Sequence, residues 1–146
     1  MEITVRCLVK DGASLPEYTT EGAAGADVRA FLDAPVIIPS GERRLIPTGI
    51  TVEIPAGYEI QVRPRSGLAL QNGITVMNTP GTIDSDYRGE IGIVLYNSDK
   101  DSFTVQHNDR IAQLVLSEVP RAMYTQSSTL TGTERSTGGY GSTGSK

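Results

Sequence analysis

The sequence predicts an all-β fold, a sandwich or barrel of short strands with one short helix. Apolar and polar residues alternate in several short segments, and turn sequences rich in Gly and Pro separate these segments. Many short alternating segments at regular spacing are typical of sandwiches and barrels. The chain of 146 residues has the usual length of one domain, which is enough to build one hydrophobic core.

Four segments predict the main strands. In three of them apolar residues recur at every second position, so that they share one face of an extended chain. These three are residues 50–54, 58–62 and 90–96, and residues 110–116 form a fourth, more continuous apolar run. Turns are expected at residues 39–41, 47–49, 55–57 and 97–99, which combine Pro, Gly, Ser, Thr, Asn and Asp.

The N-terminal segment, residues 2–10, also alternates, and it contains the only cysteine, Cys7. We interpret Cys7 as a half-buried strand residue and not as a reactive thiol. A single cysteine allows no internal disulfide and no cysteine-based metal site.

Residues 66–73 predict the one helix. Leucine and alanine side chains fill its centre, Ser66 is the expected N-cap, and Asn72 and Gly73 are expected to end it. The helix is short, so it is expected to serve as a connection within the β domain.

The charge and hydropathy exclude two classes of partner. The chain has 13 Lys+Arg and 17 Asp+Glu, whereas proteins that bind nucleic acid or anionic membranes generally present a basic face. The N-terminus lacks the apolar region of a signal peptide, and no window has the length and hydropathy of a membrane span. A soluble, intracellular protein, cytoplasmic and without a nucleic-acid or membrane partner, is therefore expected.

The last part of the chain has a different composition. Residues 127–146 contain ten Ser or Thr and five Gly, and their only sizeable apolar side chains are Leu130 and Tyr140. Such a segment cannot bury enough surface to order itself. The sequence therefore predicts a β domain over residues 1–126 and a flexible C-terminal arm over residues 127–146.

The arm resembles a phosphate-binding loop, but only in part. In "GYGSTGSK" (139–146) Ser145 separates the last glycine from Lys146, and no helix can follow, so a P-loop is rejected. Backbone N–H groups between small residues can still wrap phosphate oxygens, and Arg135 stands nearby.

Two further segments suggest a nucleotide ligand. Arg65 and Ser66 stand where the helix is expected to begin, a position at which free N–H groups, a hydroxyl and a guanidinium can converge on phosphate. Asn78 precedes a Pro-Gly turn, and its amide can both donate to and accept from the edge of a base.

Five segments, in order over residues 23–144, resemble the five motifs of the homotrimeric dUTP pyrophosphatases (dUTPases). The segments are "AAGADVRA" (23–30), "RPRSGLAL" (63–70), "NTPGTIDSDYRGEIGI" (78–93), "NDRIAQLVL" (108–116) and "RSTGGYGSTG" (135–144). The resemblance implies a distorted jelly roll, or β-clip, and hydrolysis of dUTP to dUMP and pyrophosphate. This reaction limits uracil incorporation into DNA and supplies dUMP for dTMP synthesis.

The resemblance assigns the chemistry to the third motif. Asp84 is expected to activate the water that attacks the α-phosphorus, a general-base role that suits a carboxylate. Tyr87 is expected to pack against the deoxyribose and so to exclude a 2′-hydroxyl. Asn78 is expected to pair with uracil. The resemblance also implies that backbone groups of a hairpin following Asn78 help to bind uracil, and that a glycine within a strand lets another group approach the backbone. The residues concerned are Gly81, Thr82, Ile83 and Gly92.

The other motifs are expected to hold the phosphates. Arg65, Ser66 and Gly67 match the contacts of the second motif. Gln113 matches a phosphate-facing glutamine, although a strand residue pointing to solvent gives the same signal in sequence. In the arm, Arg135 is expected at the γ-phosphate and Tyr140 on the uracil ring. Small arm residues are expected to close over the phosphates: Gly141, Ser142 and Thr143.

The resemblance also implies Mg²⁺, which prefers oxygen ligands and enters with the triphosphate. No direct protein ligand is expected; Asp27 either touches the ion through water or makes a structural hydrogen bond near a subunit interface. A homotrimer with shared active sites is implied, in which a neighbouring subunit supplies the arm. Charged residues around the third motif are expected to form turn and subunit-contact ion pairs: Asp86, Arg88 and Glu90.

One departure from the family pattern concerns the backbone. Asn108 stands where the family usually has glycine, and asparagine tolerates the left-handed conformation. The sequence allows two other interpretations, a relative of dCTP deaminase and a non-enzymatic jelly-roll regulatory protein. The Asp-Ser-Asp-Tyr string at residues 84–87 and the full set of polar groups favour the dUTPase.

Overall fold

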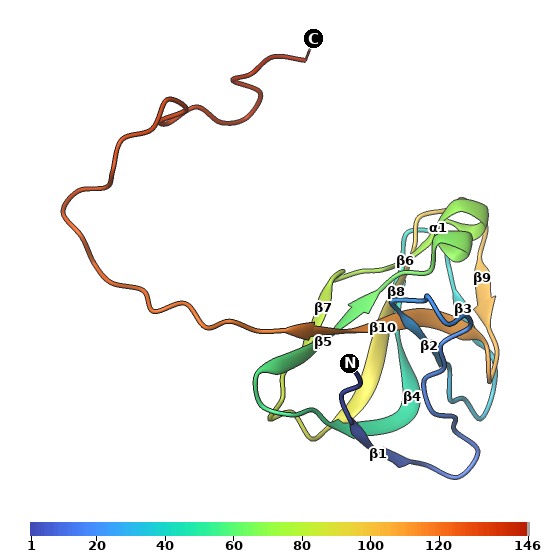
Figure 1. The fold of residues 1–146 in the computed structure, drawn as a ribbon. Helices are drawn as coiled ribbons and strands as arrows, with labels where there is room; N and C mark the ends of the chain where they lie inside the picture. Colours follow the sequence, from blue (N-terminus) through green and yellow to red (C-terminus); the bar gives the residue numbers. More distant parts are fainter. Residues whose placement is uncertain (146) are drawn as a thin grey trace.

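The computed structural model describes residues 1–145 and shows an all-β domain with one short helix, as predicted (Figure 1). The elements are β1 (Arg6–Val9), β2 (Ala26–Arg29), β3 (Val36–Ile38), β4 (Arg43–Glu53), β5 (Tyr58–Arg63), α1 (Ser66–Asn72), β6 (Ile74–Val76), β7 (Gly81–Ile83), β8 (Glu90–Asn97), β9 (Phe103–Val105) and β10 (Arg110–Glu118).

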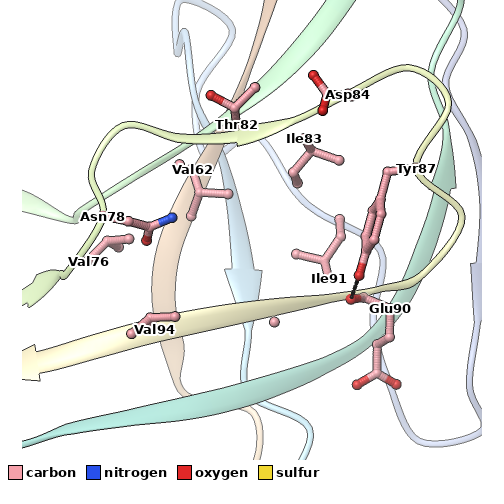
Figure 2. A pocket seen from close by; sticks show the side chains of 12 residues that line it. Val62, Val76, Asn78, Thr82, Ile83, Asp84, Tyr87, Glu90, Ile91 and Val94 are labelled. Atoms are coloured by element: carbon pink, nitrogen blue, oxygen red, sulfur yellow. Dashed lines mark hydrogen bonds between the residues drawn. The ribbon is translucent and has the colours of Figure 1, made fainter.

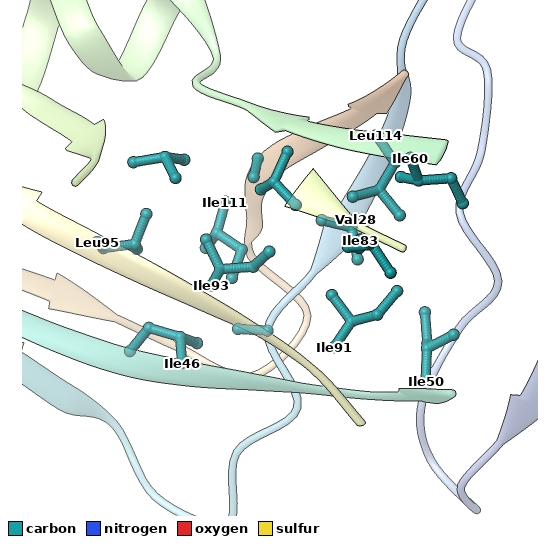
Figure 3. Close-up of a cluster of buried hydrophobic side chains, with 14 of the residues drawn as sticks. Val28, Ile46, Ile50, Ile60, Ile83, Ile91, Ile93, Leu95, Ile111 and Leu114 are labelled. Atoms are coloured by element: carbon teal, nitrogen blue, oxygen red, sulfur yellow. The ribbon is translucent and has the colours of Figure 1, made fainter. Parts of the chain in front are cut away.

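The strands form two four-stranded sheets and one two-stranded sheet. The strand orders are β1-β4-β8-β6, β2-β10-β5-β7 and β3-β9, and every pairing is antiparallel. The larger sheets share one apolar core, in which side chains of β4 and β8 meet those of β2, β5 and β10 (Figure 3). Burial of each such Ile, Leu or Val side chain contributes about 1.5–3 kcal/mol, so this core accounts for the stability of the fold.

The four segments with strand patterns lie in β4, β5, β8 and β10, except that Ile54 follows the last residue of β4. In β8 the alternating Ile91, Ile93 and Leu95 are at most 2% exposed, as the pattern predicts. The sequence did not identify β2, β3, β6, β7 and β9, which have only three or four residues each. Segments this short carry too little periodicity to be recognised.

The turn predicted at residues 47–49 is wrong, because β4 continues through it. The register between β4 and β8 shifts between Pro47 and Thr51, and Gly49 has a φ of 70°. Proline and glycine are accepted inside a strand at such a bulge. The buried Thr48 hydroxyl donates to the Ile91 carbonyl at 2.6 Å and so ties the irregular segment to β8.

The helix forms where it is predicted, but its N-cap differs. The Arg65 carbonyl accepts the first helical hydrogen bond, from Ala69, so Arg65 is the N-cap and Ser66 is already helical. Gly73 ends the helix in the left-handed conformation, with a φ of 63°. Asn108 also adopts a left-handed conformation, with a φ of 68°, as expected at that position.

Cys7 is half-buried in β1, as its alternating segment predicts. Burial raises the pKa of the Cys7 thiol. A raised pKa lowers the thiolate fraction, which makes the thiol less reactive.

The chain leaves the β domain after β10, and the C-terminal arm runs away from it (Figure 1). The hydrogen bonds of residues 127–145 all lie within that segment. Lys146, the last residue of the predicted arm, lies outside the described residues. Within residues 1–145, no helix has both the length and the hydropathy needed to cross a membrane.

Candidate functional site

A cavity of ≈ 210 Å³ lies beside β7 and β8 and is here called the hairpin cavity, after the hairpin expected there. That hairpin is not formed, because β7 pairs with β5 whereas β8 pairs with β4 and β6. β6 and β7 are edge strands of different sheets, and residues of β5, β6, β7 and β8 line the space. All the site residues predicted in the third motif contribute to the lining: Asn78, Gly81, Thr82, Ile83, Asp84, Tyr87 and Gly92. The structure therefore brings this part of the predicted site together.

Asn78 and Tyr87 lie at opposite ends of the hairpin cavity, with Ile91 between them (Figure 2). A Cβ atom on Gly81 would lie 3.1 Å from Asn78 Nδ2 and 3.2 Å from Val62 Cβ. The missing side chain therefore leaves room for the Asn78 amide beside β7. An exposed amide over an apolar floor is suited to hydrogen-bond the edge of a flat ring.

Asp84 follows the last residue of β7 and begins the turn that leads to β8. The turn is held by the Tyr87 N–H, which donates to the Asp84 carbonyl at 3.1 Å. The Asp84 side chain is exposed and points away from the floor of the cavity (Figure 2). A carboxylate at this rim is accessible to water and to a ligand.

Tyr87 forms one end wall of the hairpin cavity. Its hydroxyl donates to the Glu90 carbonyl at 3.1 Å, which folds the ring back onto the start of β8 (Figure 2). The tyrosine is 46% exposed, so one side of the ring is free to contact a ligand.

Gly92 lines the same cavity, and it also has a packing role. A Cβ atom at this position would lie 2.7 Å from Leu45 Cδ1 on β4. The close approach expected at this strand glycine is therefore made, within the chain, by a leucine side chain.

A second cavity of ≈ 300 Å³, here called the arginine cavity, collects the residues predicted in the first, second and fourth motifs. The Asp27 carboxylate pairs with Arg65 Nε at 3.2 Å and with Arg110 Nη1 at 3.3 Å. Asp27 therefore orients two guanidinium groups. Predicted residues that line this cavity are Asp27, Arg65, Ser66, Gly67 and Gln113.

The Gln113 side chain lies within the arginine cavity and does not simply extend into solvent. Its Nε2 donates to the Pro64 carbonyl at 2.9 Å. A Cβ atom on Gly25 would lie 2.1 Å from Gln113 Oε1, so the glycine provides the space in which the amide lies.

The two cavities share no lining residue. The hairpin cavity uses β7 and the arginine cavity uses β2, which are the two edge strands of one sheet. No arm residue from 127 to 145 lines either cavity, and Tyr140 is fully exposed. The predicted residues Arg135, Tyr140, Gly141, Ser142 and Thr143 lie on this arm. One chain thus holds the predicted site in three separate groups.

Several lining residues were not singled out in the sequence. Arg110 lies within the fourth motif, and its contact with Asp27 spans 83 residues. Glu90 was assigned only to a turn or subunit contact, yet it lines the hairpin cavity and pairs with Lys10. The sequence also did not identify the apolar floor of the cavity, because alternation identifies buried positions but not which of them border a cavity. The floor consists of Val62, Val76, Ile91 and Val94.

Residues 1–145 of one chain contain no set of side chains suited to bind a metal ion by themselves. No group of three or more His, Cys, Asp and Glu side chains is placed to hold an ion there. Asp84 and Asp27 line different cavities, and the Asp27 carboxylate is already paired with two arginines.

Comparisons with known proteins identify the family. The sequence model of the dUTPase family matches residues 11–144. The deoxyuridine 5′-triphosphate nucleotidohydrolase of Chlamydia pneumoniae is 56% identical over 143 residues, 97% of this chain and 99% of the relative. The enzyme of the same name from Treponema denticola is 56% identical over 136 residues, 93% of this chain and 94% of the relative.

The fold is also that of a dUTPase. The structure of the Staphylococcus bacteriophage 80alpha dUTPase with dUPNHPP superposes with a TM-score of 0.87, at 24% identity, and covers 97% of this chain and 98% of the phage chain. This similarity confirms the predicted jelly-roll β fold. The family match and the two close relatives show that the chain belongs to the dUTPase family, the enzymes that hydrolyse deoxyuridine 5′-triphosphate.

Proposed function

We propose that Asp84 is the general base with which this dUTPase hydrolyses dUTP to dUMP and pyrophosphate. The carboxylate takes a proton from a water molecule as the water oxygen attacks the α-phosphorus, and pyrophosphate leaves. The observation that supports this role is the position of Asp84 at the rim of a cavity that Asn78 and Tyr87 bound at its two ends. A nucleotide whose base and sugar are bound between them would present its α-phosphate at that rim.

The hairpin cavity is the uridine site in this proposal. The Asn78 amide and the backbone of β7 pair with uracil, which requires a donor and an acceptor on neighbouring atoms. The Tyr87 ring packs against the deoxyribose and leaves no room for a 2′-hydroxyl. The apolar floor excludes water from the base, which strengthens the hydrogen bonds that read it.

The arginine cavity is the triphosphate site of a neighbouring subunit. Asp27 holds Arg65 and Arg110 side by side, and guanidinium groups bind phosphate oxygens in a defined orientation. The hairpin and arginine cavities share no lining residue, and we propose that a complete site combines the hairpin cavity of one chain with the arginine cavity of another. The arm, whose residues 127–145 make their hydrogen bonds within that segment, is supplied by a further subunit, as in a homotrimer.

Mg²⁺ is the proposed cofactor, and it enters with the triphosphate. When bound, the ion neutralises phosphate charge and stabilises the departing pyrophosphate. Asp27 is the one residue proposed to reach it, through water. We place the enzyme in the cytoplasm, where dUTP is formed and dUMP is used for dTMP synthesis.

Substrate selectivity tests the uridine site. With Mg²⁺ present, dUTP is expected to be hydrolysed, with kcat/KM for dTTP, dCTP and UTP lower by about 10²-fold or more. Cytosine leaves the polar groups that pair with uracil unpaired. The Tyr87 wall rejects the 2′-hydroxyl of UTP, and the 5-methyl group of dTTP must be rejected by steric contact. The measurement is pyrophosphate release from the four nucleotides under identical conditions. Ammonia release from dCTP would instead support the deaminase reading, and no turnover of any nucleotide would support a non-enzymatic protein.

The oligomeric state tests the shared site. A homotrimer is expected by light scattering at micromolar concentration, with three times the mass of one chain. Apolar side chains that one chain leaves exposed support an extensive contact with other copies: Leu8, Leu15, Ile37, Leu45 and Met77. A monomer at this concentration that hydrolyses dUTP would contradict both the trimer and the shared site.

A further inference from the structure

We propose that Gly89 is a specificity-determining position, because together with the Glu90 carbonyl it sets where the Tyr87 ring stands. The inference rests on the proposed function of Tyr87 as the wall that rejects ribonucleotides. It adds a residue that touches no substrate and acts through the tyrosine alone.

The first observation is steric. A Cβ atom on Gly89 would lie 2.2 Å from Tyr87 Oη, 2.5 Å from Cζ and 2.9 Å from Cε2. Carbon atoms in proteins do not approach this closely without displacement of one group. Several glycines in residues 1–145 have a positive φ, and Gly89 is not one of them. Glycine is therefore required here for space and not for an unusual backbone conformation.

The second observation is that the acceptor of the tyrosine hydroxyl is held in place. Glu90 pairs with Thr51 of β4 in the sheet, and its carboxylate forms an ion pair with Lys10. The Lys10 N–H donates in turn to the Gly49 carbonyl of β4 at 2.9 Å. The Glu90 carbonyl thus belongs to a strand end held by its pairing with β4 and by the Lys10 ion pair. The 3.1 Å hydrogen bond from Tyr87 ties the ring to that point.

These contacts predict which group moves when a side chain is added. The tyrosine is 46% exposed, and the atoms that an added methyl group would meet are at the far end of its side chain. The ring is therefore displaced and its hydrogen bond lost, whereas the backbone of β8 stays paired. Because a 2′-hydroxyl is a single oxygen atom, a displacement of the wall by about the length of one bond is sufficient to admit it.

The test is the selectivity ratio, kcat/KM for dUTP divided by kcat/KM for UTP, measured with Mg²⁺. For Gly89→Ala the ratio is expected to fall by about tenfold or more, with little change in Tm. Gly22→Ala is the matched control, because a Cβ atom at Gly22 meets nothing within 4 Å and its φ is not positive. Its ratio is expected to equal that of the unchanged protein.

Two variants of Tyr87 separate the contribution of the ring from that of the hydrogen bond between its hydroxyl and the Glu90 carbonyl. Tyr87→Phe removes only the hydroxyl, so the ratio is expected to fall by less than for Tyr87→Ala. Gly89→Ala is expected to have a smaller effect on the ratio in the Tyr87→Phe protein than alone, because the closest contact is then absent. Additive effects of the two changes would contradict a shared mechanism.

Three outcomes distinguish this inference from the function on which it rests. If Tyr87→Ala relaxes selectivity and Gly89→Ala does not, the inference is wrong and the role of Tyr87 stands. If Tyr87→Ala leaves the ratio unchanged, both are wrong. If Gly89→Ala lowers activity on dUTP and UTP equally, Gly89 is merely structural and the inference is overturned.

Discussion

Replacing Asp84 with asparagine is expected to lower kcat for dUTP by about 10²–10⁴-fold, the usual contribution of a general base. The amide preserves the size of the side chain but cannot accept the proton of the attacking water. The side chain is exposed at the end of β7, so the change is expected to leave the fold and the oligomer intact. The measurement is kcat from pyrophosphate release at saturating dUTP, together with Tm and light scattering.

Asp86→Asn is the matched control for this prediction. Asp86 is an exposed carboxylate in the same turn, but it does not line the hairpin cavity. The same loss of charge at this position is expected to change kcat only slightly. An undiminished kcat in Asp84→Asn, or an equal loss in both variants, would show that Asp84 is not the base.

Removal of residues 134–146 is expected to leave a folded trimer that has lost most of its kcat, by about 10²-fold. The described arm makes its hydrogen bonds within itself, so its removal takes no such contact from the β domain. In the proposed mechanism Arg135 and Tyr140 close over the bound nucleotide, which excludes water and aligns the triphosphate. The measurements are kcat, Tm and the mass of the assembly.

The conformational entropy that the arm loses when it becomes ordered leads to a second expectation, for the full-length protein. A Ser-, Thr- and Gly-rich segment loses conformational entropy when it closes, and the contacts with nucleotide must offset that loss. The arm is therefore expected to be protected from proteolysis when a non-hydrolysable dUTP analogue is bound and to be cleaved without it. Equal cleavage in both states would contradict closure over the substrate.

Mixed trimers identify which chain supplies the arm. The truncated protein has Asp84 but no arm, and full-length Asp84→Asn has the arm but no base. If another subunit supplies the arm, random mixing completes roughly one site in four and restores activity. If each arm serves the site that contains its own Asp84, no mixed site is complete. Inactive mixtures in which native mass spectrometry detects mixed trimers would therefore refute the shared site.

Gly49 and Pro47 show how far local reasoning about strands extends. Alternation predicted the buried faces of β5 and β8, because side chains of a strand point to opposite faces at every second residue. The same reasoning placed a turn at residues 47–49, since Pro and Gly usually end a strand. Whether these residues form a turn or a bulge depends on pairing with β8, a segment more than forty residues away in the sequence, so the local pattern could not distinguish them.

The hairpin cavity could be predicted in outline because most of its polar groups are close in sequence. Asn78, Asp84 and Tyr87 fall within one short segment, so the turns on either side of the short β7 are enough to bring them to one cavity. The arginine cavity could not be derived in this way. Its ion pairs join Asp27 to residues 38 and 83 positions away, and a sheet in which β2 lies beside β10 is needed to bring them into contact.

The sequence by itself determined the all-β class, the single helix, the five family motifs and hence the reaction, because each of these is recorded in local periodicity or in short contiguous strings. Only the tertiary structure decided that the motifs of one chain form two cavities without a common residue. It alone also revealed that Gly89 lies against the Tyr87 ring and that Lys10 pairs with Glu90. Such contacts depend on strand order, register and side-chain direction, which arise from the packing of distant segments against one another.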